Sequence, residues 1–193
     1  MSNKKTPYTL VILHAIVYNV LCYQKGEKMK KHIPNILTFL NLTAGFLAIL
    51  LILQPHHPNK VFIISVLIFA GGIIDFFDGY LARKLGVASD FGKNLDSFAD
   101  IVTFGVAPVV FANYISNYPI FTIIAGLVFM LAASFRLARF NLHAQTDHFH
   151  GLPITAAGII LTATTPHIPA LATAILMLAL SLAMISKKQV KRL

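Results

Sequence analysis

Charged side chains are scarce in this sequence. Only 12% of its 193 residues are Asp, Glu, Lys or Arg, whereas 56% are hydrophobic, and the mean hydropathy is +0.73. So few polar side chains cannot cover the surface of a water-soluble globule. The composition therefore excludes an ordinary soluble domain and predicts an integral membrane protein.

Cysteine and acidic residues are rarer still. A single cysteine, Cys22, excludes an internal disulfide framework and argues against redox chemistry. The seven acidic residues are outnumbered by 16 Lys and Arg, and the net charge is +9. Most of the basic residues lie at predicted helix ends and at the termini, where they orient membrane helices. We therefore exclude nucleic acid as a partner.

Long apolar runs, by contrast, are abundant. Residues 35–53 would form a helix roughly 28 Å long at about 1.5 Å per residue, which matches the hydrocarbon thickness of a bilayer. Further runs follow, so we predict an all-α, polytopic membrane protein with one membrane domain over residues 29–193. Its six predicted transmembrane helices are 35–53, 61–83, 95–114, 120–142, 152–166 and 169–185.

Basic residues are unequally divided between the two sides of these spans. One side has Lys60 as its only basic loop residue. The positive-inside rule makes the richer side cytoplasmic, so both ends of the six-helix unit are predicted to lie inside a cytoplasmic membrane. The basic residues on that side are Lys30, Lys31, Arg83, Lys84, Lys93, Arg136, Arg139, Lys187, Lys188, Lys191 and Arg192.

Residues 1–28 depart from this pattern. Their apolar run is short, contains His14 and Asn19, and lacks the small-residue cleavage site of a signal peptide. Two interpretations stay open: an N-terminal interfacial helix, or an upstream extension before a natural start at Met29. Neither assigns chemistry to this segment.

Five of the seven acidic residues crowd into residues 75–100, between two apolar runs. On helices, Asp75 and Asp78 share one face, and Asp96 and Asp100 share another. Both pairs lie at the predicted cytoplasmic ends of consecutive spans, so the four carboxylates can converge. An ionised carboxylate is costly there unless it is paired or bound to a cation.

Four convergent carboxylates suit a hard divalent cation, and balancing their charge calls for about two Mg²⁺ or Mn²⁺ ions. Two-metal carboxylate sites are typical of phosphoryl transfer. Local pairing with Arg83 is the alternative interpretation.

The remaining acid, Asp90, shares neither helical face, and we expect it to be a loop residue. Gly79 and Ala82 would let a ligand approach the backbone, although close helix packing explains them almost as well.

The spacing D-x2-D-G-x2-A-R-x8-G-x3-D-x3-D, which runs from Asp75 to Asp100, resembles the motif of the CDP-alcohol phosphatidyltransferase family at every fixed position. The resemblance implies a six-helix membrane fold, usually homodimeric, that displaces CMP from a CDP-linked lipid with an alcohol. It also implies that Asp75 and Asp96 bridge both metals and that Asp78 completes the shell of the first. Asp100 would bind the second metal and act as the general base.

Contacts with the CDP-lipid follow from the same resemblance. For Asn35 and Thr38, at the start of the first span, helix capping and packing are the alternatives. Ser89 is a candidate in the predicted connecting loop. The full set of implied CDP-lipid contacts is Asn35, Thr38, Gly79, Ala82, Arg83 and Ser89.

Segments 33–49, 95–108, 134–141 and 149–158 narrow the resemblance. They are similar to the phosphatidylserine synthases of the membrane-embedded type, which implies CDP-diacylglycerol and L-serine as substrates. Thr155 stands where this pattern has proline, and we expect that departure to lie away from the metal site.

Arg136 and Arg139 lie three residues apart at the predicted cytoplasmic end of the fourth span. Two guanidiniums there could hold a serine carboxylate or a lipid phosphate bidentately, and anchoring at the interface is the alternative.

Another acceptor alcohol, such as glycerol 3-phosphate or inositol phosphate, and an archaeal CDP-diether lipid as the donor stay open. A divalent-cation transporter is disfavoured because the outer halves of the spans carry no acidic residue.

Overall fold

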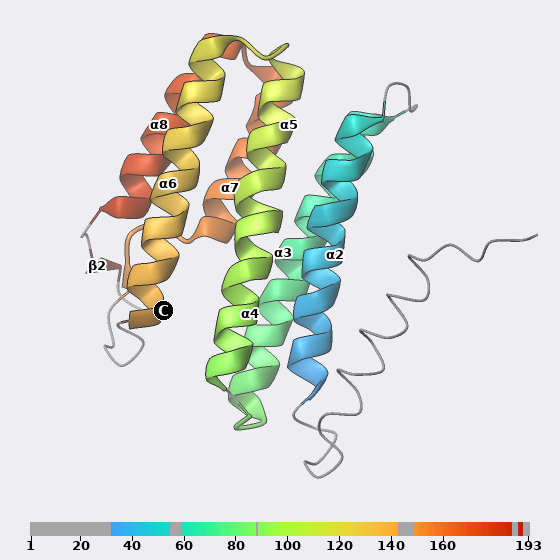
Figure 1. Ribbon diagram of the computed structural model, residues 1–193, viewed down its shortest axis with the longest axis vertical. Coiled ribbons are helices and arrows are strands. Elements are labelled where there is room, and N and C mark those ends of the chain that lie inside the picture. Colours follow the sequence, from blue (N-terminus) through green and yellow to red (C-terminus); the bar gives the residue numbers. More distant parts are fainter. Residues whose placement is uncertain (1–31, 55–58, 88, 143–148, 187–188, 191–193) are drawn as a thin grey trace, which may run out of the picture.

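The computed structural model describes residues 32–54, 59–87, 89–142, 149–186 and 189–190 (Figure 1). The predictions for residues 1–28 and Met29 fall outside these ranges. The described helices are α2 (His32–Leu53), α3 (Lys60–Lys84), α4 (Asp90–Asp100), the π-helix η2 (Ile101–Val106), α5 (Ala107–Ile115), α6 (Ile120–Leu142), α7 (Ile154–Thr164), the 3₁₀ turn η3 (Thr165–His167) and α8 (Ala170–Ile185). Two short strands, β1 (Phe149–His150) and β2 (Gln189–Val190), pair antiparallel.

Four of these helical segments are long and apolar enough to cross a membrane: Pro34–Leu53, Lys60–Lys84, Asp90–Ile115 and Ile120–Asn141. This confirms the expectation of a polytopic, helical membrane protein. The fifth and sixth predicted spans coincide with α7 and η3 and with α8. The helix α7 has 11 residues and α8 has 16, so each is shorter than the roughly 20 residues that a typical crossing needs.

The helices pack into one bundle in which consecutive rods run in opposite directions (Figure 1). The pair α2 and α3 forms a hairpin, α4, η2 and α5 form one continuous rod, and α6 lies against α8. The turn from α3 to α4 lies at one end of the bundle, and the turn from α5 to α6 lies at the other.

Most buried side chains of the bundle are apolar, and much of its outer surface is apolar as well. Phe104, Phe111 and Phe129 are fully buried, whereas Leu131 and Leu182 are more than 70% exposed. Large exposed aliphatic side chains on helices of this length are expected where lipid rather than water surrounds the protein.

Neighbouring helices approach the π-helix η2 closely. A side chain on Gly45 or Gly71 would collide with Thr103, and one on Gly158 would meet the backbone of Phe104. Small residues at such crossings let helix backbones come together. The hydroxyl of Thr103 also donates to the Asn41 carbonyl at 3.0 Å.

Lys60 was predicted to be the only basic loop residue on one side of the membrane spans, and in the structure it has a structural role. Its side chain is 6% exposed, and Nζ donates to the carbonyls of Ile52 and Gln54 at 2.6 Å each. The ammonium group also lies 4.2 Å from the ring centroid of Tyr114. Lys60 therefore satisfies carbonyls at the end of α2 that have no partner within the helix.

The third helical segment begins earlier than predicted. We expected it to start near residue 95 and Asp90 to be a loop residue, but α4 begins at Asp90. The Ser89 side chain accepts a hydrogen bond from the Gly92 amide at 3.1 Å. This N-cap stabilises an extra turn of helix, and the acidic Asp90 in that first turn complements the helix dipole.

Candidate metal centre

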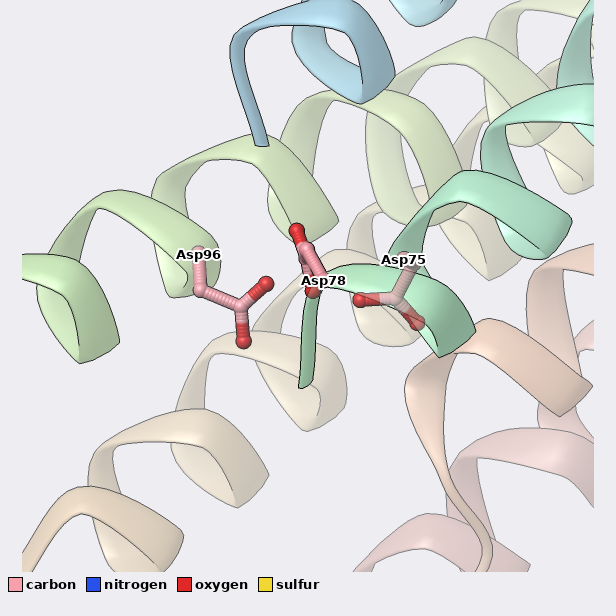
Figure 2. Close-up of side chains that lie close together, drawn as sticks. All are labelled: Asp75, Asp78 and Asp96. Carbon is pink, nitrogen blue, oxygen red and sulfur yellow. The ribbon is translucent and has the colours of Figure 1, made fainter. Parts of the chain in front are cut away.

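Three carboxylates meet between α3 and α4. Asp75 and Asp78 come from α3 and Asp96 from α4, and one oxygen from each lies within 4.8 Å of the others. Figure 2 shows the three side chains turned toward a common space between the two helices. The structure thus brings together residues that are distant in sequence but were predicted to converge.

The turn between α3 and α4 produces this convergence. The Gly86 amide donates to the Arg83 carbonyl at 3.2 Å, and the Val87 amide donates to the Ala82 carbonyl at 3.1 Å. With Gly86 at φ 64°, these bonds form a Schellman motif, which ends a helix and reverses the chain within a few residues. The Ser89 cap then starts α4 beside α3.

A threonine hydroxyl holds each aspartate of α3. Thr38 of α2 donates to Asp78 Oδ2 at 2.9 Å, and Thr155 of α7 donates to Asp75 Oδ2 at 3.1 Å. Asp78 and Thr38 are both buried, at 4% and 3% exposure. Hydrogen bonds from outside a ligand set orient the carboxylates that bind a metal.

The contact of Thr155 corrects the sequence-based expectation. Thr155 was expected to lie away from the acidic cluster, yet it touches Asp75 from 80 positions along the chain. The only sequence signal was the departure from proline in the family pattern. A departure of this kind does not reveal which side chain it faces.

Asp100 extends the cluster deeper into the bundle. Its side chain is 7% exposed and lies beside both Asp75 and Asp96. Asp96 Oδ1 and Asp100 Oδ1 are buried and have no hydrogen-bond partner within the described parts of the chain. Buried carboxylate oxygens without partners are costly, so this donor set fits hard divalent cations.

The two candidate arginines of α6 lie in different surroundings. Arg136 is 7% exposed, and its Nε has no hydrogen-bond partner among the described residues. It lies within electrostatic range of Asp100. Arg139 is half-buried and donates to the Ile185 carbonyl at the end of α8, at 3.3 Å. Arg136 is thus a buried cation within electrostatic range of Asp100.

The residues expected to contact a CDP-lipid lie on α2, on α3 and at the start of α4. Arg83 is exposed and interacts electrostatically with Asp78. A Cβ added to Gly92 would lie 3.3 Å from Asn35 Oδ1 and 3.2 Å from Ser89 Oγ, so both side chains face the start of α4. Ala82 is half-buried on α3. The Ser89 and Thr38 side chains already serve as a helix cap and as the partner of Asp78.

A further polar contact fixes α4 against α6. Asn141 Nδ2 donates to Ser97 Oγ at 3.0 Å, and Ser97 directly follows Asp96 in the chain. This contact, which sequence reasoning did not anticipate, restrains the helix that carries Asp96.

Fold and site together define a helical membrane protein with a buried carboxylate centre suited to divalent cations. The sequence model of the CDP-alcohol phosphatidyltransferase family matches residues 31–191, and the chain belongs to this family.

Similar proteins have related names. The chain is 41% identical over 133 residues to the CDP-diacylglycerol–serine O-phosphatidyltransferase of Bacillus subtilis (strain 168), covering 67% of this chain and 73% of that protein. It is 41% identical over 131 residues to the Methanocaldococcus jannaschii protein of the same name, covering 67% of this chain and 58% of that protein. It is 32% identical over 166 residues to the archaetidylserine synthase of Methanothermobacter thermautotrophicus, covering 83% of this chain and 70% of that protein.

Proposed function

We propose that this protein transfers the phosphatidyl group of CDP-diacylglycerol to the hydroxyl of L-serine, forming phosphatidylserine and releasing CMP. The observation that carries the proposal is the meeting of Asp75, Asp78 and Asp96 at the family spacing. The names of the Bacillus and Methanocaldococcus relatives support serine as the acceptor.

The carboxylates of Asp75, Asp78, Asp96 and Asp100 would hold two Mg²⁺ or Mn²⁺ ions. Such ions neutralise the pyrophosphate and stabilise the leaving group of a phosphoryl transfer. Thr38 and Thr155 keep the two carboxylates of α3 oriented toward this position.

Asp100 is the proposed general base. Its buried Oδ1 is available among the described residues and accepts the proton of the serine hydroxyl. The serine oxygen then forms a bond to the lipid-bearing phosphorus as the bond from that phosphorus to the CMP oxygen breaks. A serine hydroxyl is a poor nucleophile at neutral pH, so a base within reach removes one of the two difficulties of the step.

The substrates occupy two sides of the cluster in this proposal. The exposed Arg83 and the bare backbone at Gly79 and Ala82 receive the CDP group, with Asn35 and Ser89 beside it. The buried Arg136 receives the serine carboxylate near Asp100, because guanidinium pairs with carboxylate bidentately. Arg139 supports this side of the site through its contact with α8.

The proposal also includes the membrane arrangement. All six helical segments cross or enter a cytoplasmic membrane with the carboxylate centre at the cytoplasmic face. The lipid substrate then stays in the leaflet, and serine and CMP exchange with water. The family resemblance further supports a homodimer, for which the exposed apolar helix faces offer surface.

The test is release of CMP from CDP-diacylglycerol by purified protein supplied with a panel of acceptors. We expect release to require L-serine and to be much slower with glycerol 3-phosphate or inositol phosphate. Release without serine, or a preference for a phosphorylated acceptor, would contradict the proposal. Because one relative is named archaetidylserine synthase, a CDP-diether lipid is included as an alternative donor.

A further inference from the structure

We propose that Thr155 is a positioning residue that orients Asp75 and thereby sets the affinity of the carboxylate centre for divalent cations. This inference rests on the proposed function, since it assumes that the carboxylates bind cations. It concerns a residue that the family pattern does not predict, because the pattern has proline at this position, and proline has no hydroxyl to donate.

The hydrogen bond itself has the geometry of a real contact. Thr155 Oγ1 lies 3.1 Å from Asp75 Oδ2, which is slightly longer than usual for a hydroxyl donor and an oxygen acceptor but short enough for a direct hydrogen bond. Both side chains are half-buried, so water competes less for the bond than it would on an open surface. A hydrogen bond to one oxygen restricts the rotation of the Asp75 carboxylate about its side chain.

The packing of α7 on α3 fixes the position of that hydroxyl. Gly72 lies one helical turn before Asp75, and a Cβ at Gly72 would be 2.9 Å from Ile159 Cδ1 and 3.6 Å from Thr155 Cγ2. The glycine therefore lets α7 lie close to α3, and the Thr155 methyl group faces Gly72. With its methyl group held there, the hydroxyl of a β-branched side chain has few other directions available.

A second close contact holds α7 from another side. A Cβ on Gly158 would lie 2.5 Å from the Phe104 carbonyl oxygen of η2, so α7 is pressed against both α3 and η2. Thr155 is also in the first turn of α7, where the positive end of the helix dipole favours a nearby carboxylate. These contacts make Thr155 a rigid donor rather than a flexible one.

The consequence is measurable as cation affinity. Residues that hydrogen-bond to metal ligands typically change affinity by about 10- to 100-fold when they are removed. Thr155→Val keeps the shape of the side chain and replaces the hydroxyl with a methyl group, so it removes the bond with little change in packing. Thr155→Ser keeps the hydroxyl.

The experiment is titration of the purified full-length protein with Mn²⁺, with free Mn²⁺ followed by electron paramagnetic resonance. We expect Thr155→Val to bind Mn²⁺ about 10- to 100-fold more weakly than wild type, and Thr155→Ser to bind much as wild type does. Thr162→Val is the matched control, because Thr162 is buried on the same helix but donates within it, to the Gly158 carbonyl. This control should leave affinity unchanged.

Activity supplies a second readout. The Mn²⁺ concentration for half-maximal CMP release should rise in Thr155→Val, with kcat largely recovered at saturating Mn²⁺. A merely structural role would instead lower kcat and thermal stability at all Mn²⁺ concentrations. If Thr155→Val is too unstable to purify, Thr155→Ala removes the same hydroxyl and is expected to show the same weakened binding.

Any one of three results overturns the proposal. The first is wild-type Mn²⁺ affinity in Thr155→Val. The others are a loss of Mn²⁺ affinity in Thr155→Ser or in Thr162→Val that equals the loss in Thr155→Val. Wild-type protein that binds no Mn²⁺ overturns it together with the metal assignment. The acceptor is tested separately: weaker Mn²⁺ binding in Thr155→Val supports the inference even if serine proves to be the wrong alcohol.

Discussion

Asp100 is the residue on which the proposed reaction depends most directly. It is almost fully buried, beside Asp75 and Asp96, and Arg136 lies near it. It is not one of the three aspartates that each have an oxygen within 4.8 Å of the others. Its buried Oδ1 has no hydrogen-bond partner among the described residues, and Arg136, the arginine proposed to receive serine, is within electrostatic range of it; both observations support its proposed role as proton acceptor.

The first prediction concerns Asp100→Asn. Asparagine has nearly the same shape and keeps one oxygen, but its amide cannot take a proton from the serine hydroxyl. We expect CMP release to fall by about 10²- to 10⁴-fold, while much of the binding of CDP-diacylglycerol is retained. Turnover is measured as CMP release, and binding is measured by equilibrium titration with the CDP-lipid.

The matched control for this substitution is Asp90→Asn. Asp90 is exposed in the first turn of the same helix, α4, so its replacement removes a favourable interaction with the helix dipole of no more than about 1 kcal/mol. Activity should be unchanged. Undiminished turnover in Asp100→Asn would refute the assignment of the base.

At the scale of helices, Gly79 and Gly158 have different surroundings. Close helix packing was an open explanation for Gly79. Within the described part of the chain, however, a Cβ on Gly79 would meet only the Arg83 guanidinium, at 3.5 Å and beyond. A Cβ on Gly158 would instead lie 2.5 Å from the Phe104 carbonyl oxygen. Packing therefore explains Gly158 and leaves the bare backbone at Gly79 for a ligand.

The second prediction separates stability from activity with two glycine variants. Gly158→Ala forces α7 away from η2, and we expect it to destabilise the protein by about 1–3 kcal/mol. Gly79→Ala should preserve or slightly raise stability, since alanine favours helix more than glycine does, and should raise the KM for CDP-diacylglycerol. Thermal unfolding and CMP release are measured for both. An unstable but otherwise active Gly79→Ala protein would contradict this interpretation.

The helices were predictable because their signals are local. Apolar runs of membrane length located α2, α3 and α6 within a few residues. The start of α4 was predicted about five residues too late, because residues 90–94 are largely polar and the expected span followed hydropathy alone. The cap at Ser89, with Asp90 after it, is a local signal that could have corrected this.

The acidic cluster was also predictable, since its members follow helical spacing on two adjacent helices. The Thr155 contact was not, because it depends on where α7 crosses α3. That crossing is set by Gly72 and Ile159, and no pattern within either helix encodes the pairing. The π-helix η2 was missed for the same reason, because it lies where three glycines let other elements approach it.

For the whole molecule, the structure sharpens the charge asymmetry that suggested an orientation. Lys60 was the only cation predicted on one side, and its ammonium group is buried against the carbonyls that end α2. It therefore contributes little charge to that surface. At the opposite end, Arg83, Lys84 and Lys93 are exposed around the turn from α3 to α4. By the positive-inside rule, this distribution supports the proposal that the turn and the carboxylate centre beside it face the cytoplasm.

The third prediction tests this orientation with single cysteines in a Cys22→Ser background. Asn94→Cys lies near the start of α4, and His167→Cys lies in η3 between α7 and α8; both native side chains are exposed. In spheroplasts, a membrane-impermeant maleimide should label His167→Cys readily and Asn94→Cys only after permeabilisation. The Cys22→Ser protein itself should remain unlabelled, and CMP release by each variant shows that it is folded.

The labelling result also bears on how α7 is placed in the membrane. At about 1.5 Å per residue, the 11 residues of α7 span only about 16 Å, roughly half the hydrocarbon thickness. If His167→Cys is nevertheless labelled from outside, α7 and η3 reach the outer surface from a starting point inside the bilayer. The N-terminal turn that carries Thr155 would then lie below the cytoplasmic surface, at the depth of Asp75. Labelling of both cysteines from one side would contradict this arrangement.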